Sequence, residues 1–454
     1  MSTFMAIDPS TGHEFAELPA TTPEQVSDMA DVARQMLGLN PEWREPLTRA
    51  KALQNLARAI EAEHDKLAEL ECRDTGKPLK QAKADVKATV RYLDYYAGST
   101  ERLEGRQIPL GPDVLDYTLR EPWGVCAQII PWNYPLQVTA RCAAPALAAG
   151  NAVIVKPSEL ASITPLRFAE LAEEAGVPRG LIQVATGDGA TGAALASDPA
   201  VDHVTFVGSA PTGAKVAEAC ARRLIPIELE LGGKSPNVVF ADADLEKAIP
   251  AIVQALIQNA GQSCSAGTRL LVERSAYDEV IERVETALSK VTIGPGIEDL
   301  DIGPLISERQ LERTTSMLAK AESQGATIIG GGHTHGLYLK PTLVTDVKPE
   351  MDIFQEEVFG PVLTALPFDD DRAAVALANF SQYGLVAGVW TRDLSRAHRV
   401  AHGIHAGQIF VNTYGVGGGV ELPFGGMKRS GYGRGKGIEA LLAYSQVKNV
   451  CIAL

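Results

Sequence analysis

The sequence is poor in the residues that build metal centres and disulfide frameworks. It has six cysteines and eight histidines, which form no C-x-x-C pair and no metal-ligand spacing. The cysteines are scattered along the chain, at positions 72, 126, 142, 220, 264 and 451. This pattern excludes a zinc-ribbon or disulfide-stapled fold, predicts that no metal is bound, and favours free thiols in the reducing cytoplasm.

Positive charge is also scarce. Lys and Arg number 42 against 56 Asp and Glu, and the formal net charge is -14. Such an acidic chain has nothing in bulk that neutralises phosphates. Nucleic acids and anionic membranes are therefore excluded as general partners, which leaves a small molecule.

Long apolar runs are missing too. The N-terminal "MSTFMAIDPSTGHEF" has neither a basic nor an apolar leader segment, and "AIPAIVQALI" is too short to cross a bilayer. No repeat or low-complexity segment is visible. We therefore expect a cytoplasmic protein.

What the sequence does contain is typical of a multidomain globular protein. At 454 residues the chain is too long for one core, which suggests two or three domains. In "LTRAKALQNLARAIEAEHDKLAEL" the apolar residues recur at helical spacing, so the N-terminal quarter is predicted to be helical.

Short apolar runs then alternate with helix-like stretches such as "TPLRFAELAEEAGV". The runs are "GVCAQIIPW", "NAVIVKPSE", "LIQVATGDG", "HVTFVGS" and "SPNVVFADAD". This alternation predicts an α/β protein with a parallel sheet that is covered on both faces. A second α/β section is expected from near residue 232.

Polar residues follow several of these runs, where ligands of parallel sheets bind. Asn133, Lys156, Glu159 and Ser209 are in this position. Ser209 in "FVGSAPTG" would open a helix, which suits either a bound phosphate or a simple N-cap. Lys156 and Glu159 in "VKPSE" are either a solvated ion pair or two groups that bind an adenosine ribose. A carboxylate there would repel a 2′-phosphate and favour NAD over NADP.

One glycine-rich segment is less informative. "GDGATG", residues 187–192, matches G-x-G-x-x-G between a predicted strand and helix. However, no acidic residue ends a strand about twenty residues later, as the dinucleotide fingerprint requires. A plain strand-to-helix turn explains the segment equally well.

Three further side chains suggest a common chemistry. Cys264 in "QNAGQSCSAGTR" is surrounded by residues too small to cover its sulfur. Glu230 in "ELELGGKSP" is either a general base or a surface carboxylate, and Asn133 in "WNYP" is either an oxyanion donor or a turn cap. Together they fit a thiolate that attacks a carbonyl, an amide that holds the oxyanion, a cofactor that takes hydride, and a carboxylate that activates water.

These segments, in this order, resemble the aldehyde dehydrogenase superfamily. The resemblance covers nearly the whole chain and rests on "IIPWNYP", "ALAAGNAVIVKPSE", "FVGS", "ELGGKSPNVVF", "NAGQSCSAGTR", "EEVFGPV" and "PFGGMKRSGYGRGKG". It implies an NAD-dependent, non-phosphorylating oxidation of an aldehyde to a carboxylic acid, with NADP less favoured.

The resemblance also implies an architecture. A Rossmann-like coenzyme domain would comprise residues 1–102 and 123–231, and a catalytic α/β domain residues 232–433. A small oligomerisation β-flap would comprise residues 103–122 and 434–454. The assembly is expected to be a homodimer or homotetramer.

Roles for single residues follow from the resemblance position by position. Cys264 would be the nucleophile, Glu230 the base for deacylation, and Asn133 would share the oxyanion hole with the Cys264 amide. The implied coenzyme contacts are Ile130, Trp132, Lys156, Glu159, Gly189, Ser209, Leu231, Glu357 and Phe359.

The chain departs from the family at Arg141. Many members, including those that resemble betaine aldehyde dehydrogenase, have Trp at this position, and members that oxidise semialdehydes often have Arg. Arg141 either binds a carboxylate on the aldehyde or pairs with a neighbouring acidic group, for instance at a subunit interface. Gln258 stands where succinic semialdehyde enzymes often have a second Arg, which argues against succinic semialdehyde itself.

Other functions compete with hydrolytic oxidation of an acidic aldehyde. A neutral or amino-aldehyde is the first alternative substrate. A coenzyme-A-acylating enzyme is disfavoured by Glu230, which such relatives usually lack. A non-catalytic scaffold is disfavoured because Cys264, Glu230 and Asn133 are all present.

Overall fold

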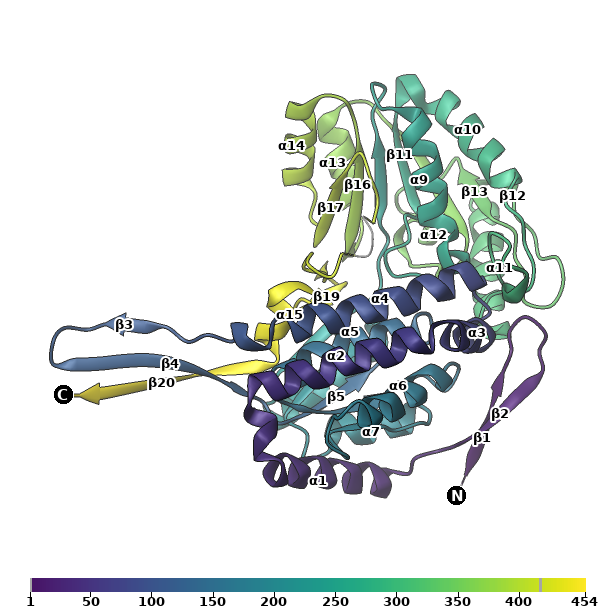
Figure 1. The fold of residues 1–454 in the computed structure, drawn as a ribbon. Helices are drawn as coiled ribbons and strands as arrows, with labels where there is room; N and C mark the ends of the chain where they lie inside the picture. Colours follow the sequence, from purple (N-terminus) through teal and green to yellow (C-terminus); the bar gives the residue numbers. More distant parts are fainter. Residues whose placement is uncertain (1, 416–418) are drawn as a thin grey trace.

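The structure is a computed structural model that describes residues 2–415 and 419–454. Two lobes, each built on a mainly parallel sheet, face each other, and a long arm projects from one of them (Figure 1). The predicted α/β class with parallel sheets is confirmed. No helix in the described ranges is long and apolar enough to span a bilayer.

The first lobe begins with a hairpin and four helices. These are β1 (Thr3–Ile7), β2 (Glu14–Pro19), α1 (Pro23–Leu39), α2 (Pro46–Ala62), α3 (His64–Thr75) and α4 (Leu79–Ala97). The predicted helical quarter is thus confirmed. Its apolar stripe is buried, because Leu53, Leu56, Ile60 and Leu67 all have 0% exposure.

The sheet of this lobe has the strand order β19-β9-β8-β5-β6-β7. Its strands are β5 (Val125–Ile129), β6 (Ala152–Lys156), β7 (Ile182–Val184), β8 (His203–Val207), β9 (Ile227–Glu230) and β19 (Gly431–Tyr432). The connecting helices are α5 (Pro135–Ala148), α6 (Ile163–Glu174), α7 (Gly189–Ser197) and α8 (Ala210–Arg223). The strand order reverses between β5 and β8, which is where such sheets bind ligands.

The second lobe has the strand order β12-β13-β14-β11-β10-β16-β17. Its strands are β10 (Pro236–Val239), β11 (Arg269–Glu273), β12 (Thr327–Gly330), β13 (Thr342–Thr345), β14 (Val362–Phe368), β16 (Val386–Trp390) and β17 (Gln408–Val411). Its helices are α9 (Leu245–Ile257), α10 (Tyr277–Ser289), α11 (Glu308–Ser323), α12 (Asp352–Gln355), α13 (Asp371–Asn379) and α14 (Leu394–Gly403). All neighbouring pairs are parallel except β12 and β13.

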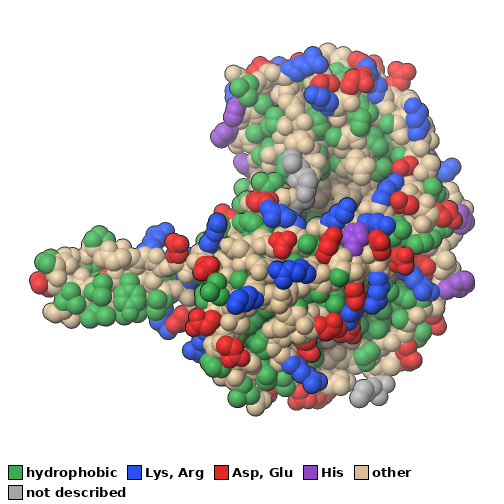
Figure 2. Space-filling model, viewed as in Figure 1, with side chains coloured by type: hydrophobic (Ala, Val, Ile, Leu, Met, Phe, Trp, Pro, Cys, Tyr) green, Lys and Arg blue, Asp and Glu red, His purple; other side chains and the backbone are tan. Residues whose placement is uncertain are grey.

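The arm is a separate antiparallel sheet of order β20-β4-β3. Its strands are β3 (Gln107–Pro109), β4 (Val114–Pro122) and β20 (Ser445–Ala453), and α15 (Gly437–Ala443) precedes β20. The arm extends away from both lobes and carries many hydrophobic side chains on the side seen in Figure 2.

The domain limits drawn from the sequence stay predictions, and one strand of the predicted catalytic domain joins the sheet of the first lobe. β19 lies inside the range predicted for the catalytic domain, yet it pairs antiparallel with β9 of the first sheet. The small sheet of β15 (Tyr383–Gly384) and β18 (Met427–Lys428) leads into this return of the chain. The C-terminal segment therefore closes over the strand that carries Glu230.

Candidate active site

A cavity of about 1170 Å³ lies between the lobes, within the hollow visible in Figure 2. The first lobe contributes residues that follow its strands, at the carboxyl edge: residues 131–134 after β5, 208–212 after β8, and 230–232 at the end of β9. The second lobe contributes residues that precede its strands: 263–265 before β11, and Glu357 and Phe359 before β14. The site is thus built by the carboxyl edge of one sheet and the amino edge of the other.

Cys264 is half-buried and lines this cavity. It follows a turn, η3 (Gln258–Gly261), in which Asn259, Ala260 and Gly261 have φ values of 50°, 54° and 74°. Three left-handed residues in a row are strained and persist only when their surroundings fix them. At Gly261 a glycine is required, because a Cβ would lie 2.2 Å from the Gly360 carbonyl oxygen.

Burial raises the pKa of the Cys264 thiol to about 12, although Arg141 and Lys436 lower it. The thiol is therefore protonated at neutral pH in the protein without ligand. A reactant or cofactor that brings positive charge to the site would favour the thiolate.

Asn133 lines the same cavity and is 4% exposed. Its Nδ2 donates to the Gln262 carbonyl oxygen at 3.0 Å, two residues before Cys264. A side-chain amide has two hydrogens, so a second one is available for an oxyanion beside the sulfur. The backbone carbonyl oxygen of Asn133 in turn accepts from Asn259 Nδ2 at 2.9 Å.

Glu230 ends β9 and is 3% exposed. Its carboxylate forms an ion pair with the Arg141 guanidinium, which projects from α5 into the same cavity. Burial raises the pKa of Glu230, and Arg141 opposes this effect by favouring the charged form. Arg141 was expected either to bind a carboxylate on the aldehyde or to pair with a neighbouring acidic group. It does pair with an acidic group, and the partner is Glu230 of the same chain.

A second buried carboxylate, Glu228, stands two residues before Glu230 on the same face of β9. Burial raises its pKa to about 8, and the charge of Glu230 adds to the shift. A Cβ at Gly435 would lie 2.0 Å from Glu230 Oε1 and 3.3 Å from Glu228 Oε1. A glycine at 435 therefore makes room for both carboxylates.

Lys436 also lines the cavity, and its ammonium lies 5.1 Å from the centre of the Phe424 ring. Burial lowers its pKa to about 8. Sequence reasoning missed Glu228 and Lys436. The alternating "IELEL" pattern could have indicated Glu228, since alternate residues of a strand share a face.

Ser209, Glu357 and Phe359 line the same cavity. Glu357 accepts from the Gly233 backbone N–H at 3.0 Å, and burial raises its pKa to about 7. Phe359 adopts φ 59° and packs edge-to-face on Trp132, with ring centres 5.3 Å apart. Ser209 is the exposed N-cap of α8, where backbone N–H groups are free to meet an anion.

The remaining predicted coenzyme contacts divide into two groups. Glu159 and Leu231 line the cavity. Ile130, Lys156 and Gly189 lie outside the set of described residues that line it, although Lys156 Nζ is 3.7 Å from Glu159 Oε2. Among the described residues, no group of three or more His, Cys, Asp or Glu side chains is placed to hold a metal ion.

Comparison with known proteins agrees with this geometry. A family model described as "Aldehyde dehydrogenase family" matches residues 1–450. The chain belongs to the aldehyde dehydrogenase family.

Individual relatives are similar over their whole length. A betaine aldehyde dehydrogenase from Vibrio vulnificus is 41% identical, with 98% of this chain and 95% of that protein covered. The NAD+ complex of an aldehyde dehydrogenase from Bacillus cereus is 39% identical, covers 100% of this chain and 94% of its own, and has a TM-score of 0.98. An NAD-dependent aldehyde dehydrogenase from Sinorhizobium meliloti is 38% identical, with 100% and 92% coverage and a TM-score of 0.98.

The aldehyde dehydrogenase cavity of this chain has room and partners for a dinucleotide. The amide groups at the start of α8 suit a pyrophosphate, and the Glu357 carboxylate suits a ribose hydroxyl. Gly232 is needed here, because a Cβ would lie 2.3 Å from the Glu357 carboxylate. The cavity continues from these residues to Cys264, so a bound ring could reach the sulfur.

Proposed function

We propose that this protein oxidises an aldehyde to a carboxylic acid with NAD as the hydride acceptor. The observation that carries the proposal is a single cavity that Cys264, Asn133, Glu230, Ser209 and Glu357 all line. Nucleophile, oxyanion donor, base and cofactor contacts thus share one cavity.

Cys264 supplies the nucleophile. The thiol proton passes to solvent as the sulfur bonds to the carbonyl carbon of the aldehyde, and the carbonyl oxygen becomes an oxyanion that Asn133 Nδ2 and the Cys264 backbone N–H stabilise. NAD held by Ser209 and Glu357 would supply the acceptor for the hydride on this carbon, and loss of that hydride leaves a thioester on Cys264. Glu230 then takes a proton from water, the water oxygen attacks the thioester carbon, and the C–S bond breaks to release the acid.

The Arg141–Glu230 ion pair supports the role of Glu230 as the base. Burial raises the pKa of this carboxyl, and a protonated acid cannot accept a proton from water. The guanidinium opposes this shift and favours the ionised form that a base requires.

Two coenzyme contacts support NAD over NADP. Glu159 lines the cavity and pairs with Lys156, which suits a ribose with two free hydroxyls. A 2′-phosphate would meet the Glu159 carboxylate and be repelled.

Arg141 favours an acidic aldehyde, such as a semialdehyde. It lines the cavity, and its Nη2 binds Glu230 while its Nε has no hydrogen-bond partner among the described residues. A quaternary ammonium would be repelled there, whereas a carboxylate would be attracted and could share Arg141 with Glu230. Gln258, which also lines the cavity, adds polarity without charge.

Oxidation of an amino-aldehyde is the second candidate, because relatives at 41% and 40% identity are described as betaine aldehyde dehydrogenases. The two candidates differ in the sign of charge that the site must accept. They are therefore separable by a panel of substrates.

The test measures NADH formation with succinic semialdehyde and a longer acidic aldehyde against betaine aldehyde, propanal and benzaldehyde. The wild type is compared with Arg141→Trp, and Arg222→Trp, at an exposed arginine of α8, is the matched control. Arg141→Trp also removes the partner of Glu230, which would lower the activity toward every aldehyde. The ratio of kcat/KM between two aldehydes is therefore compared, because such a general loss of activity cancels in the ratio.

The acidic-aldehyde proposal expects wild type to prefer the acidic aldehydes and Arg141→Trp to lose at least about tenfold of that preference. A preference for betaine aldehyde in the wild type would contradict it and support the second candidate. Absence of NADH with every aldehyde would contradict oxidation itself.

We also propose that the arm joins copies of the chain into a homodimer or homotetramer. On one face of its sheet, Leu115 of β4 lies beside Ile452 of β20, and Leu119 lies further along β4 on the same face; their exposures are 39%, 41% and 42%. Exposed apolar side chains gathered on one face favour burial against another surface.

A further inference from the structure

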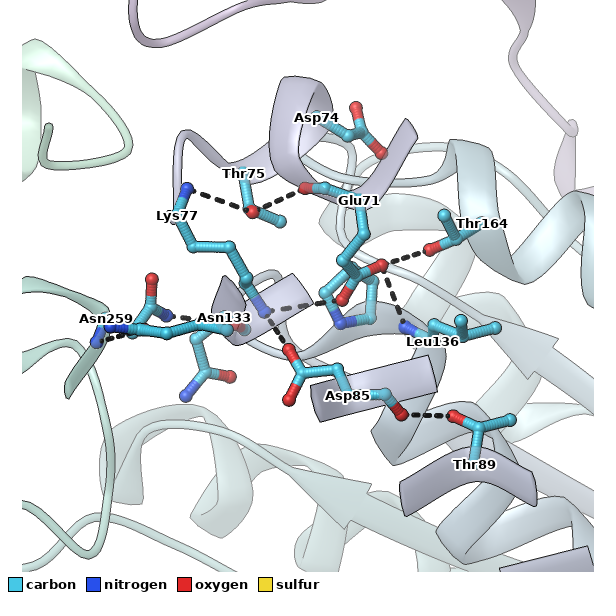
Figure 3. A network of polar contacts seen from close by, with 12 residues as sticks. Glu71, Asp74, Thr75, Lys77, Asp85, Thr89, Asn133, Leu136, Thr164 and Asn259 are labelled. Atoms are coloured by element: carbon cyan, nitrogen blue, oxygen red, sulfur yellow. Dashed lines mark hydrogen bonds and ion pairs between the residues drawn. The ribbon is translucent and has the colours of Figure 1, made fainter. Parts of the chain in front are cut away.

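A buried ionic cluster lies behind the Asn133 side of the cavity (Figure 3). Lys77, between α3 and α4, places its Nζ 3.3 Å from Glu71 Oε1 and 2.6 Å from Asp85 Oδ2. The side chains of Lys77 and Glu71 have 0% exposure, and that of Asp85 has 8%. Charges so deeply buried cost free energy that apolar residues of similar size would not.

The two carboxylates favour the charged form of Lys77 at the centre of the cluster. Burial alone would lower the pKa of Lys77, but Asp85 and Glu71 together raise it. A permanent ammonium is therefore held in the interior. None of these three groups has a part in the proposed reaction steps.

The cluster contacts the segment that carries Asn133. Glu71 Oε2 accepts from the Leu136 backbone N–H at 3.4 Å, in the first turn of α5, and from Thr164 Oγ1 at 2.5 Å. The Lys77 ammonium lies 4.4 Å from the centre of the Tyr134 ring. The cluster therefore holds Tyr134 and Leu136, which come one and three residues after Asn133.

The same helix pair also supports the Cys264 side. Gln81 of α4 accepts, through Oε1, from the Asn259 backbone N–H at 2.8 Å. The side-chain Nδ2 of Asn259 in turn donates to the backbone carbonyl oxygen of Asn133. The corner between α3 and α4 thus contacts both the segment that carries Asn133 and the strained turn before Cys264.

We propose that Lys77, held by Glu71 and Asp85, is a positioning residue that aims the Asn133 amide at the oxyanion formed on Cys264. The inference rests on the proposed role of Asn133. An apolar side chain at position 77 would fill the space but would not hold the Tyr134 ring and Glu71 in one place. Small displacements of an oxyanion donor cost large factors in rate, about 100-fold for one ångström.

The test is a double-mutant cycle on the full-length protein, read as the rate constant of the first turnover of NADH. We expect Lys77→Met to slow this step by about 10- to 100-fold, while the Kd for NAD changes by less than about twofold. In an Asn133→Ala background, Lys77→Met should change the rate by less than about twofold, because its effect passes through Asn133. Lys83→Met, at an exposed lysine of α4, is the matched control.

Equal losses from Lys77→Met in both backgrounds would overturn the inference, since they would show an effect independent of Asn133. An unchanged first turnover in Lys77→Met would overturn it too. If Asn133→Ala alone turned over like wild type, the proposed role of Asn133 would fail instead. Should Lys77→Met not fold, Asp85→Asn, which keeps the size of the side chain, replaces it in the same cycle with the same expected non-additivity.

Discussion

Glu228 and Glu230 place two carboxylates side by side in the interior, and only Glu230 forms an ion pair with Arg141. Burial raises the pKa of Glu228 from 4.5 to about 8. In the unfolded chain Glu228 ionises above about pH 4.5, whereas in the folded protein it stays protonated up to about pH 8. Its contribution to stability is therefore unfavourable, and grows as the pH rises between these two values.

We expect Glu228→Gln to unfold at a higher temperature than wild type at about pH 8, because the glutamine removes this cost. Near about pH 4.5 the two proteins should unfold at nearly the same temperature. Thermal unfolding across this pH range is the measurement, with Glu218→Gln, at an exposed position of α8, as the control. A difference that does not change with pH would contradict a protonated Glu228.

Glu159 is the residue on which we propose that the choice of NAD depends. Its side chain is 47% exposed and is paired with Lys156 at 3.7 Å. We expect Glu159→Gln to reduce the ratio of kcat/KM for NAD over NADP by about tenfold, since the repulsion of a 2′-phosphate is lost. Steady-state kinetics with both cofactors measure this ratio, and Glu170→Gln, at an exposed position of α6, is the control. An unchanged ratio would remove the argument for Glu159.

Among the single residues of the site, the sequence indicated Cys264, Asn133 and Glu230, because the neighbours of each are informative. Small residues surround Cys264, aromatic residues flank Asn133, and glycines lie next to Glu230. The sequence did not decide the partner of Arg141. That pairing depends on how α5 packs against the end of β9, and no local pattern reports such a distance. Lys436 was missed for the same reason, since it approaches Phe424 and Arg141 only after the chain returns to the first lobe.

Among the elements, the two sheets contribute to the site in opposite ways. Asn133, Ser209 and Glu230 come at or just after the ends of strands, as the rule for parallel sheets predicts. Cys264 and Glu357 instead precede β11 and β14, at the amino edge of the second sheet. The rule therefore finds the first group and not the second. The small neighbours of Cys264 indicated that residue, and only the resemblance indicated Glu357.

The arm offers a direct test at the level of an element. We expect the double variant Leu119→Glu with Ile452→Glu to dissociate the oligomer, because charges would be buried on the apolar face of β4 and β20. Val447→Glu is the matched control, since Val447 pairs with Arg120 and so lies on the opposite face of the arm. Sedimentation velocity would measure the change, and an unaltered assembly in the double variant would contradict an interface on this face.

For the whole molecule, the alternation of strands and helices predicted the α/β class, and the helical spacing of apolar residues predicted the helical N-terminal quarter. What neither pattern could predict is the return of the chain at β19, because two residues are too short to show a strand pattern. This return matters, since it brings Gly435 against Glu228 and Glu230. The closed end of the cavity is thus a product of long-range assembly rather than of any one segment.

The central claim is that oxidation passes through a thioester on Cys264 that Glu230 helps to hydrolyse. It is tested most directly by incubating Glu230→Gln with NAD and aldehyde and measuring NADH and the intact mass of the protein together. We expect NADH to form in an amount close to the number of sites and then to stop, with the acyl group trapped on Cys264 and absent from Cys264→Ala. Steady turnover without an adduct, or an adduct that persists in Cys264→Ala, would contradict the account.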